Sequence, residues 1–279
     1  MSASLSLKPV KRSPVRIYAG KKYYRFKRYI AWYFGKKKYA AEKQDALLPH
    51  VIFRHQTLLL RKLNNVDMQL QHNKVKNLKI ATKRINKLIV KPGETFSYWR
   101  LIGNTTKRKG YVEGMILHYG KVTTGTGGGL CQLSNLIYWL TLHSPLTVTE
   151  RYRHSYDVFP DSNRSQPFGS GATCAYNYLD LQITNETNTT YQLIVEVTDT
   201  HLTGEWRATV PPIKRYEVYE RDHFISQEFW GGYVRHNKIY RKTYNLGNEL
   251  MDDEFITENH AVMMYSPLLA EQTAATKQF

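Results

Sequence analysis

The chain has 279 residues, of which 42% are hydrophobic and 23% are charged, and it contains two cysteines. These values are ordinary for a globular protein, and they exclude a collagen-like, wholly disordered or membrane-spanning chain, a disulfide scaffold and a cysteine-rich zinc module. The charge is uneven, since residues 1–110 carry 27 Lys or Arg and 4 Asp or Glu, whereas residues 111–279 carry 13 and 19.

The first third of the chain is therefore strongly basic. Such a charge attracts nucleic acid, anionic lipid or an acidic partner through long-range forces that salt screens. Nucleic acid is disfavoured as the partner, because no recognition motif accompanies the charge. The alternative is that the charge only keeps the surface soluble or faces the chain's own acidic half.

Residues 25–38 interleave aromatic and basic side chains. This composition suits contact with an anionic membrane surface, and the alternative is that the aromatic rings dock on the core. The longest apolar run nearby, residues 29–34, is far shorter than the ~20 residues of a membrane-spanning helix. No apolar secretory segment follows the N-terminal positive charges. We therefore expect a cytoplasmic protein without a signal peptide or transmembrane segment, peripheral at the inner membrane face, with free thiols.

Apolar residues at helical spacing predict helices over residues 50–63 and 64–88. Farther along the chain, apolar and polar residues alternate in residues 179–183 and 191–197, which predicts a hairpin with one buried face. Shorter alternating segments predict additional strands at residues 205–210, 216–219, 233–244 and 261–265, with a turn inside the third of these near His236.

These elements predict an α+β fold, in which helices pack on a mainly antiparallel sheet. Local hairpins favour antiparallel pairing, and no regular β-α-β alternation is visible. We assign this domain to residues 65–279. A basic, aromatic-rich and partly helical region precedes it at residues 1–64.

The most unusual segment is residues 125–140, which begins with four glycines in five positions. Glycine permits positive φ values and lets another group approach closely. The apolar residues that follow nearly encircle a predicted buried helix, so Cys131 lies in its first turn. The N–H groups and the positive dipole end of a helix start stabilise an anion. We therefore expect the pKa of this thiol to be lowered.

A nucleophilic cysteine needs a base within hydrogen-bond reach. His154 is the best placed of the ten histidines, because the strand expected over residues 150–159 returns beside the predicted helix. We expect Asp161 rather than Asp157 to orient the imidazole, since a two-residue period puts Asp157 on the opposite face. The alternative is structural, because a free cysteine is often a small core residue and a glycine-rich turn can serve packing alone.

No cofactor or metal ion is expected. The glycine loop lacks the Gly-Lys-Ser/Thr ending of a phosphate-binding loop. The cysteines and histidines also lack the short paired spacing of a zinc site.

Four segments resemble the VanW family in their order and spacing, and they are residues 91–97, 109–111, 127–134 and 150–155. The end of the chain, at residues 229–237 and 254–260, resembles the short members of this family. The family is named for an accessory protein of glycopeptide-resistance clusters in bacteria. The resemblance therefore implies an association with antibiotic resistance or cell-wall metabolism, and it supplies no mechanism.

Within these motifs we expect a set of ligand-binding residues, namely Gly127, Gly128, Gly129, Gln132, Ser134, Arg151 and Ser155. Longer members of the family commonly carry an aspartate at the position that corresponds here to Gly171. If that acid belongs to a catalytic set, this chain lacks it or Asp161 substitutes for it.

Two functions stay open. In the first, Cys131 attacks a carbonyl of a peptidoglycan-type peptide in acyl transfer or hydrolysis, and His154 acts as base and then as acid. Backbone N–H groups near Cys131 and Gln132 would hold the oxyanion. In the second, the same helix start belongs to a non-catalytic module that binds an anionic cell-wall precursor or a membrane surface.

Overall fold

The computed structural model describes residues 12–60, 67–118, 120–158 and 166–267. Its helices are α1 (Pro14–Phe34), α2 (Met68–Ile85), α3 (Tyr98–Ile102) and α4 (Cys131–Leu142), with a 3-10 turn at Lys107–Lys109. The helix starts follow from local sequence. Ser13 caps α1 by accepting from the N–H of Arg16, and Pro14 takes the first helical position, where its missing N–H costs nothing. Asp67 caps α2 in the same way.

The strands form three four-stranded sheets and one hairpin within the described residues. The first sheet has the order β1 (Lys38–Tyr39), β4 (Glu94–Ser97), β9 (Gln182–Thr184) and β7 (Thr147–Glu150). The second has the order β2 (His50–Leu58), β11 (His201–Ala208), β10 (Tyr191–Val197) and β3 (Leu88–Val90). The third has the order β12 (Lys214–Gln227), β13 (Tyr233–Asn245), β14 (Leu250–Met263) and β8 (Tyr156–Asp157). The hairpin joins β5 (Glu113–His118) to β6 (Lys121–Thr126).

Pairing is mainly antiparallel, and the parallel pairs among the described strands are β1 with β4 and β8 with β14. The predicted α+β class with a mainly antiparallel sheet is therefore confirmed. No helix in the described ranges is long and apolar enough to cross a bilayer.

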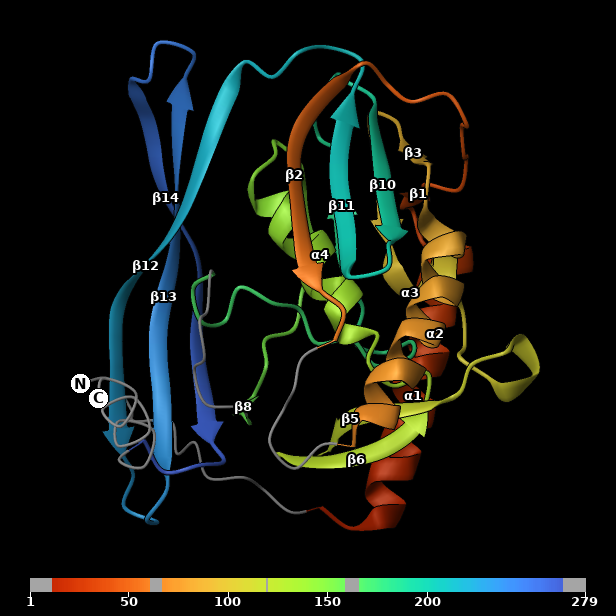
Figure 1. The fold of residues 1–279 in the computed structure, drawn as a ribbon, viewed down its shortest axis with the longest axis vertical. Helices are drawn as coiled ribbons and strands as arrows, with labels where there is room; N and C mark the ends of the chain where they lie inside the picture. Colours follow the sequence, from red (N-terminus) through yellow and green to blue (C-terminus); the bar gives the residue numbers. More distant parts are fainter. Residues whose placement is uncertain (1–11, 61–66, 119, 159–165, 268–279) are drawn as a thin grey trace.

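The main core lies between α4 and the second sheet, and α2 packs against β10 beside it (Figure 1). Gly204 of β11 lets α4 approach closely, because a Cβ there would lie 2.8 Å from Cδ1 of Leu140. The apolar side of α4, including Leu133 and Ile137, is completely buried. Burial of such side chains contributes about 1.5–3 kcal/mol each, so this contact fixes the helix and its first residue in place.

The third sheet is a long twisted ribbon that stands beside the rest of the molecule (Figure 1). Three polar side chains hold it there. Arg241 of β13 donates to the carbonyl of Ser144 at 3.0 Å, and Asn237 donates to the carbonyl of Phe168 at 2.7 Å. Arg151 donates to the hydroxyl of Thr257 of β14 at 3.0 Å.

Two predictions about single elements were wrong. Residues 50–58 form β2 rather than a helix, and residues 61–63 of that predicted helix lie outside the described residues. Exposure along β2 largely alternates, and the strand pairs with β11. The strand β13 also runs straight through His236, where we had expected a turn.

The predicted hairpin of residues 179–183 and 191–197 was also wrong. Both strands exist, but β9 pairs with β4 and β7, whereas β10 pairs with β11 and β3. The alternation of apolar and polar residues indicates that a strand has a buried face, but it does not indicate which strand lies next to it. The division at residues 64 and 65 stays a prediction, although pairing of β2 with β11 joins the two parts in one sheet.

Candidate functional site

The glycine loop at residues 127–129 packs directly on β5 and α2. A Cβ at Gly128 would lie 2.2 Å from the carbonyl carbon of Gly114, and one at Gly129 would lie 2.3 Å from Cγ of Lys74. Gly127 and Gly129 also have φ values of 80° and 90°, which glycine adopts without strain. Packing and backbone conformation therefore account for these glycines, and their role in ligand binding stays a prediction.

Cys131 is the first residue of α4, as the sequence predicted. It keeps a solvent-exposed surface, yet the surrounding protein is dense enough that burial raises the pKa of its thiol. The backbone N–H groups of Cys174 and of Cys131 itself face the sulfur and offset only part of this effect. The expected lowering of the pKa was therefore wrong in direction, because desolvation outweighs the favourable field of the helix start.

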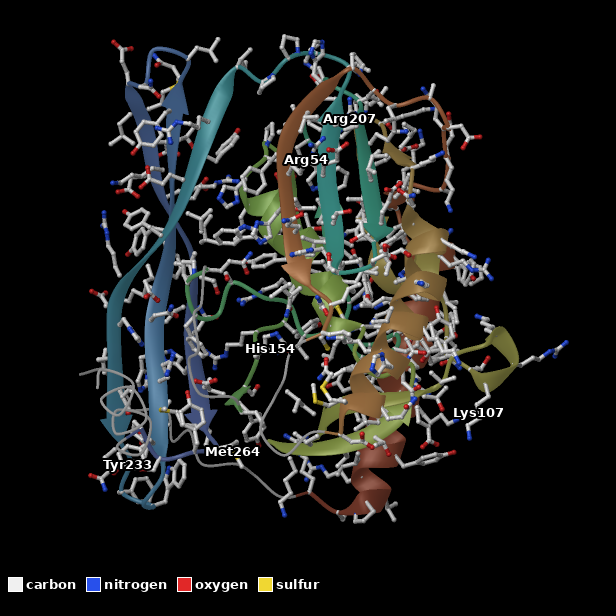
Figure 2. The ribbon with its side chains drawn as sticks, viewed as in Figure 1. Arg54, Lys107, His154, Arg207, Tyr233 and Met264 are labelled. Carbon is white, nitrogen blue, oxygen red and sulfur yellow. The ribbon has the colours of Figure 1, made fainter. Side chains whose placement is uncertain are left out.

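His154 lies near the centre of the molecule, between the third sheet and the remainder (Figure 2). Its Nε2 is 3.3 Å from Oδ1 of Asn135, and its Nδ1 is 2.7 Å from the hydroxyl of Thr173. Asn135 stands one helical turn after Cys131, so both side chains leave the same face of α4. The structure thus brings His154 to the turn of α4 that begins with Cys131.

The amide of Asn135 indicates which ring nitrogen of His154 carries the proton. Its Oδ1 also accepts from the N–H of Ala172 at 2.8 Å, which identifies the amide oxygen as the atom that faces His154. Nε2 must then carry a proton to donate to that oxygen, and Nδ1 accepts from the hydroxyl of Thr173. Nδ1 is therefore the basic nitrogen of His154.

The site is formed where residues 171–174 and the segment that carries His154 meet the start of α4. The N–H of Thr173 donates to the carbonyl of Tyr152 at 2.8 Å, which ties the segment of Gly171–Cys174 to the segment that carries His154. Burial raises the pKa of Cys174 well above its ordinary value, and the neighbouring Cys131 adds to this effect. Both cysteines are therefore neutral thiols at neutral pH.

Gly171 leaves room for the amide of Asn135. A Cβ at Gly171 would lie 2.6 Å from Oδ1 of Asn135 and 3.0 Å from Nε2 of His154. Any side chain at this position would start against both groups. Asn135 thus occupies the space beside the imidazole toward which a side chain at residue 171 would point.

The acidic residues do not complete the site among the described residues. Asp161 lies outside the described residues. Asp157 is buried, and its Oδ2 is 3.2 Å from Nε of Arg235 and accepts from the hydroxyl of Tyr265 at 2.8 Å. Those contacts tie Asp157 to the third sheet.

Gln132 lies beside Cys131 and is half-buried. Its Nε2 donates to the hydroxyl of Thr57 at 2.8 Å and to the carbonyl of Leu58 at 2.9 Å, and its buried Oε1 has no hydrogen-bond donor within the described part of the chain. Its backbone N–H donates to the carbonyl of Gly129 at 3.2 Å. The N–H of Gln132 is thus already paired, and an oxyanion held by N–H groups near Cys131 and Gln132 stays a prediction, whereas the side-chain oxygen of Gln132 is suited to accept from a ligand.

The other predicted ligand-binding residues mainly form hydrogen bonds with backbone groups. Ser134 is buried and donates to the carbonyl of Ala172 at 2.8 Å. Arg151 donates to the carbonyl of Gly171 at 2.9 Å and lies over the ring of Tyr138. Ser155 is exposed, and its carbonyl accepts from β14. Ser134 and Arg151 thus position the segment of Gly171, and a direct ligand contact by any of the three stays a prediction.

Sequence reasoning missed a buried acidic cluster under α1. Desolvation raises the pKa of Asp180 to about 6, although the hydroxyl of Ser97 and the N–H of Trp99 donate to its carboxylate at 2.6 and 2.9 Å. Next to it, Glu150 forms a bidentate ion pair with Arg28 of α1. Within the described ranges, no group of three or more His, Cys, Asp or Glu side chains could hold a metal ion.

Comparison with known proteins places the site inside a family match. The model described as "VanW like protein" matches residues 73–207, which contain Cys131, Asn135, His154 and Gly171. The Vancomycin B-type resistance protein VanW of Enterococcus faecalis is 36% identical over 228 residues, covering 81% of this chain and 82% of that protein. The uncharacterized protein YoaR of Bacillus subtilis is 28% identical over 145 residues, covering 51% of this chain and 44% of that protein. No solved structure matches the chain significantly.

Proposed function

The chain belongs to the VanW family, and from this premise we propose that it takes part in bacterial resistance to vancomycin-type antibiotics through chemistry on a cell-wall peptide. A family member that matches most of this chain is named for vancomycin resistance, which supports the association. The finer part of the proposal is that Cys131 is the nucleophile of an acyl transfer or hydrolysis and that His154 is its base.

The chemistry follows from the protonation states. Because burial raises the pKa of Cys131, the thiol holds its proton at neutral pH and needs a base at the moment of attack. Nδ1 of His154 receives a proton through the hydroxyl of Thr173, which passes its own proton to Nδ1 and takes that of the thiol as the sulfur bonds to the carbonyl carbon of the substrate. The imidazolium then protonates the leaving amine or alcohol, and water or an acceptor amine cleaves the thioester.

Backbone N–H groups stabilise the negative charge that forms on the substrate during the proposed reaction. In this proposal the backbone N–H groups of Cys131 and Cys174, which favour the thiolate form of Cys131, hold the oxyanion that forms on the carbon bonded to the sulfur. Thr173, which hydrogen-bonds Nδ1 of His154, directly precedes Cys174 in the chain. The basic nitrogen and the sulfur are thus linked through two consecutive residues, and this link is the observation that carries the proposal.

The test uses purified protein and peptidoglycan-type peptides, with the products separated by mass spectrometry. We expect turnover in the wild type, its loss in Cys131→Ser, and at least a hundredfold lower rate in His154→Ala. Cys174→Ser is the matched control, since it removes the other thiol of the site and keeps the N–H that faces Cys131. Equal turnover in the wild type and Cys131→Ser would contradict the proposal.

A second candidate function is non-catalytic binding of a cell-wall precursor. It is favoured by two observations, the neutral state of both thiols and the buried Oε1 of Gln132 that is suited to a ligand donor. In this case Cys131→Ser keeps the affinity for the precursor, as measured by calorimetry, and no peptide is converted. Conversion that depends on Cys131 excludes this candidate.

A further inference from the structure

The helix α1 has one face that is attached to the rest of the molecule. Arg28 pairs with Glu150, and Nε of Arg25 donates to the carbonyl of Tyr176 at 3.0 Å. The hydroxyl of Tyr29 is 2.8 Å from that of Tyr176, and Trp32 is buried in the core. These residues recur at three- and four-residue intervals, so they define a single side of the helix.

Another face of α1 carries large apolar side chains in solvent. Its members are Val15, Tyr23, Phe26, Ile30, Tyr33 and Phe34, with exposed fractions between 45% and 84%. Projected at 3.6 residues per turn, they fall within a sector of about 100°. We call this surface the aromatic face of α1. Contiguous exposed apolar surface of this kind in a soluble molecule marks a place where something binds.

Positive charge borders the aromatic face on both sides. Lys22 lies along one edge, Arg16 and Lys27 lie along the other, and all three are exposed. Residues 14–38 hold nine Lys or Arg and no Asp or Glu. The matching surface must therefore be acidic and at the same time able to receive aromatic rings.

We propose that the aromatic face of α1 binds the surface of an anionic lipid bilayer. Aromatic and aliphatic side chains with flanking Lys and Arg characterise helices that lie in the plane of a membrane, with rings among the acyl chains and cations on the headgroups. A second copy of the chain fits less well, because it would bring one basic helix against another. The start of α1 extends past the β5–β6 hairpin at the edge of the molecule (Figure 1).

This binding is independent of the chemistry proposed at Cys131. It would keep the site close to a membrane, where lipid-linked substrates are found. Arg25, Arg28 and Trp32 attach α1 to the rest of the molecule, so the helix is already fixed with its aromatic face outward before a membrane is bound. Little ordering entropy is then lost when the membrane is bound.

The experiment is co-sedimentation of the full chain with vesicles of phosphatidylcholine alone or with 30% phosphatidylglycerol. We expect binding to the anionic vesicles that is at least tenfold stronger than to the neutral ones and that weakens as salt rises. Ile30→Glu and the charge reversal Lys27→Glu should each weaken it at least tenfold. The matched controls Phe229→Glu and Lys121→Glu change an exposed ring and an exposed cation elsewhere and should leave it unchanged.

Three results would overturn the proposal. The first is no binding of the wild type to anionic vesicles. The second is equal weakening by Ile30→Glu and Phe229→Glu. The third is a dimer of the wild type in analytical ultracentrifugation that Ile30→Glu dissociates, because the aromatic face would then be the contact between two copies. Circular dichroism of Ile30→Glu and Lys27→Glu establishes that both variants are folded.

Discussion

The imidazole of His154 is held on both sides by groups that sequence patterns do not single out. Asn135 accepts from Nε2 and Thr173 donates to Nδ1, so rotation of the ring would break two hydrogen bonds. A ring fixed in this way presents one basic nitrogen, which is what a general base requires. At the scale of single residues, the orientation of the imidazole thus depends on Asn135 and Thr173.

The contact between Gly171 and Asn135 gives a test by double substitution. Gly171→Ala puts a Cβ 2.6 Å from Oδ1 of Asn135, and forcing atoms into such a space costs about 1–3 kcal/mol of unfolding free energy. In the background Asn135→Ala that oxygen is absent, so Gly171→Ala should cost at least about 1 kcal/mol less there. Urea unfolding of the four proteins measures both values, and strictly additive costs would contradict the contact.

The residue scale is where sequence reasoning about the site succeeded only in part. The placement of Cys131 at a helix start and of His154 beside that helix could be predicted from local patterns, whereas the strand expected over residues 150–159 was wrong, since residues 151–155 are not in a strand. Asn135 could not, since its importance arises from a contact across nineteen positions and its only local signal is its place one turn after Cys131. The pKa of Cys131 was wrong in direction because the packing density around a thiol is not encoded in spacing.

At the scale of elements, α4 is positioned by close approach to the second sheet. The side chains of Leu136 and Leu140 lie where a Cβ of residue 204 would be, at 3.0 and 2.8 Å. The element therefore depends on glycine in β11, and a shift of α4 would move Cys131 and Asn135 together.

Two glycine substitutions should have opposite effects. Gly204→Ala overpacks the contact with α4 and should lower the free energy of unfolding by about 1–3 kcal/mol. Gly20→Ala lies inside α1 with nothing within 4 Å of the added Cβ, so it should raise the stability of the helix by up to about 1 kcal/mol. Thermal unfolding checks both, and a stabilising Gly204→Ala would contradict the packing described for α4.

Element predictions failed where pairing over long distances decided the outcome. The helices α2 and α4 were predicted because their patterns are local. Residues 50–58 became a strand because β11 offers them a free edge, and β10 found its hairpin partner in β11 rather than in β9. The pairing partner of β2 or of β10 cannot be predicted from the residues of that strand alone, since the alternation of apolar and polar residues describes one strand at a time.

At the scale of the whole molecule, a buried ionic cluster joins the basic helix to the rest. Arg28 of α1 pairs with Glu150, and the N–H of Asp180 lies 3.3 Å from the same carboxylate. The strongly basic start of the chain is thus tied to acidic residues beyond position 110. Part of the positive charge of the first 110 residues is thus paired inside the protein, whereas Arg16, Lys22 and Lys27 stay exposed on α1.

The pKa of Asp180 predicts a dependence of stability on pH. Its folded value of about 6 exceeds the ordinary value of 3.8, so the native state holds the proton more tightly than the unfolded chain. The free energy of unfolding therefore falls by about 3 kcal/mol for this group as the pH rises from about 4 to about 6.

Asp180→Asn removes this contribution. Between pH 4 and 6, the stability of the wild type should fall relative to that of Asp180→Asn, and the difference should level off above pH 7. Urea unfolding at one-unit intervals measures the two curves. Parallel curves across this range would mean that the carboxylate of Asp180 titrates normally in the folded protein.

The measurement that most directly tests the central claim is the intact mass of the protein after brief exposure to a reactive ester of a peptidoglycan-type peptide. The account predicts one acyl group on the wild type, mapped by digestion to Cys131, and the same adduct on Cys174→Ser. His154→Ala should acquire it at least a hundredfold more slowly, and Cys131→Ser should acquire none. An adduct that forms at equal rates with and without His154, or that maps to Cys174, would contradict the account.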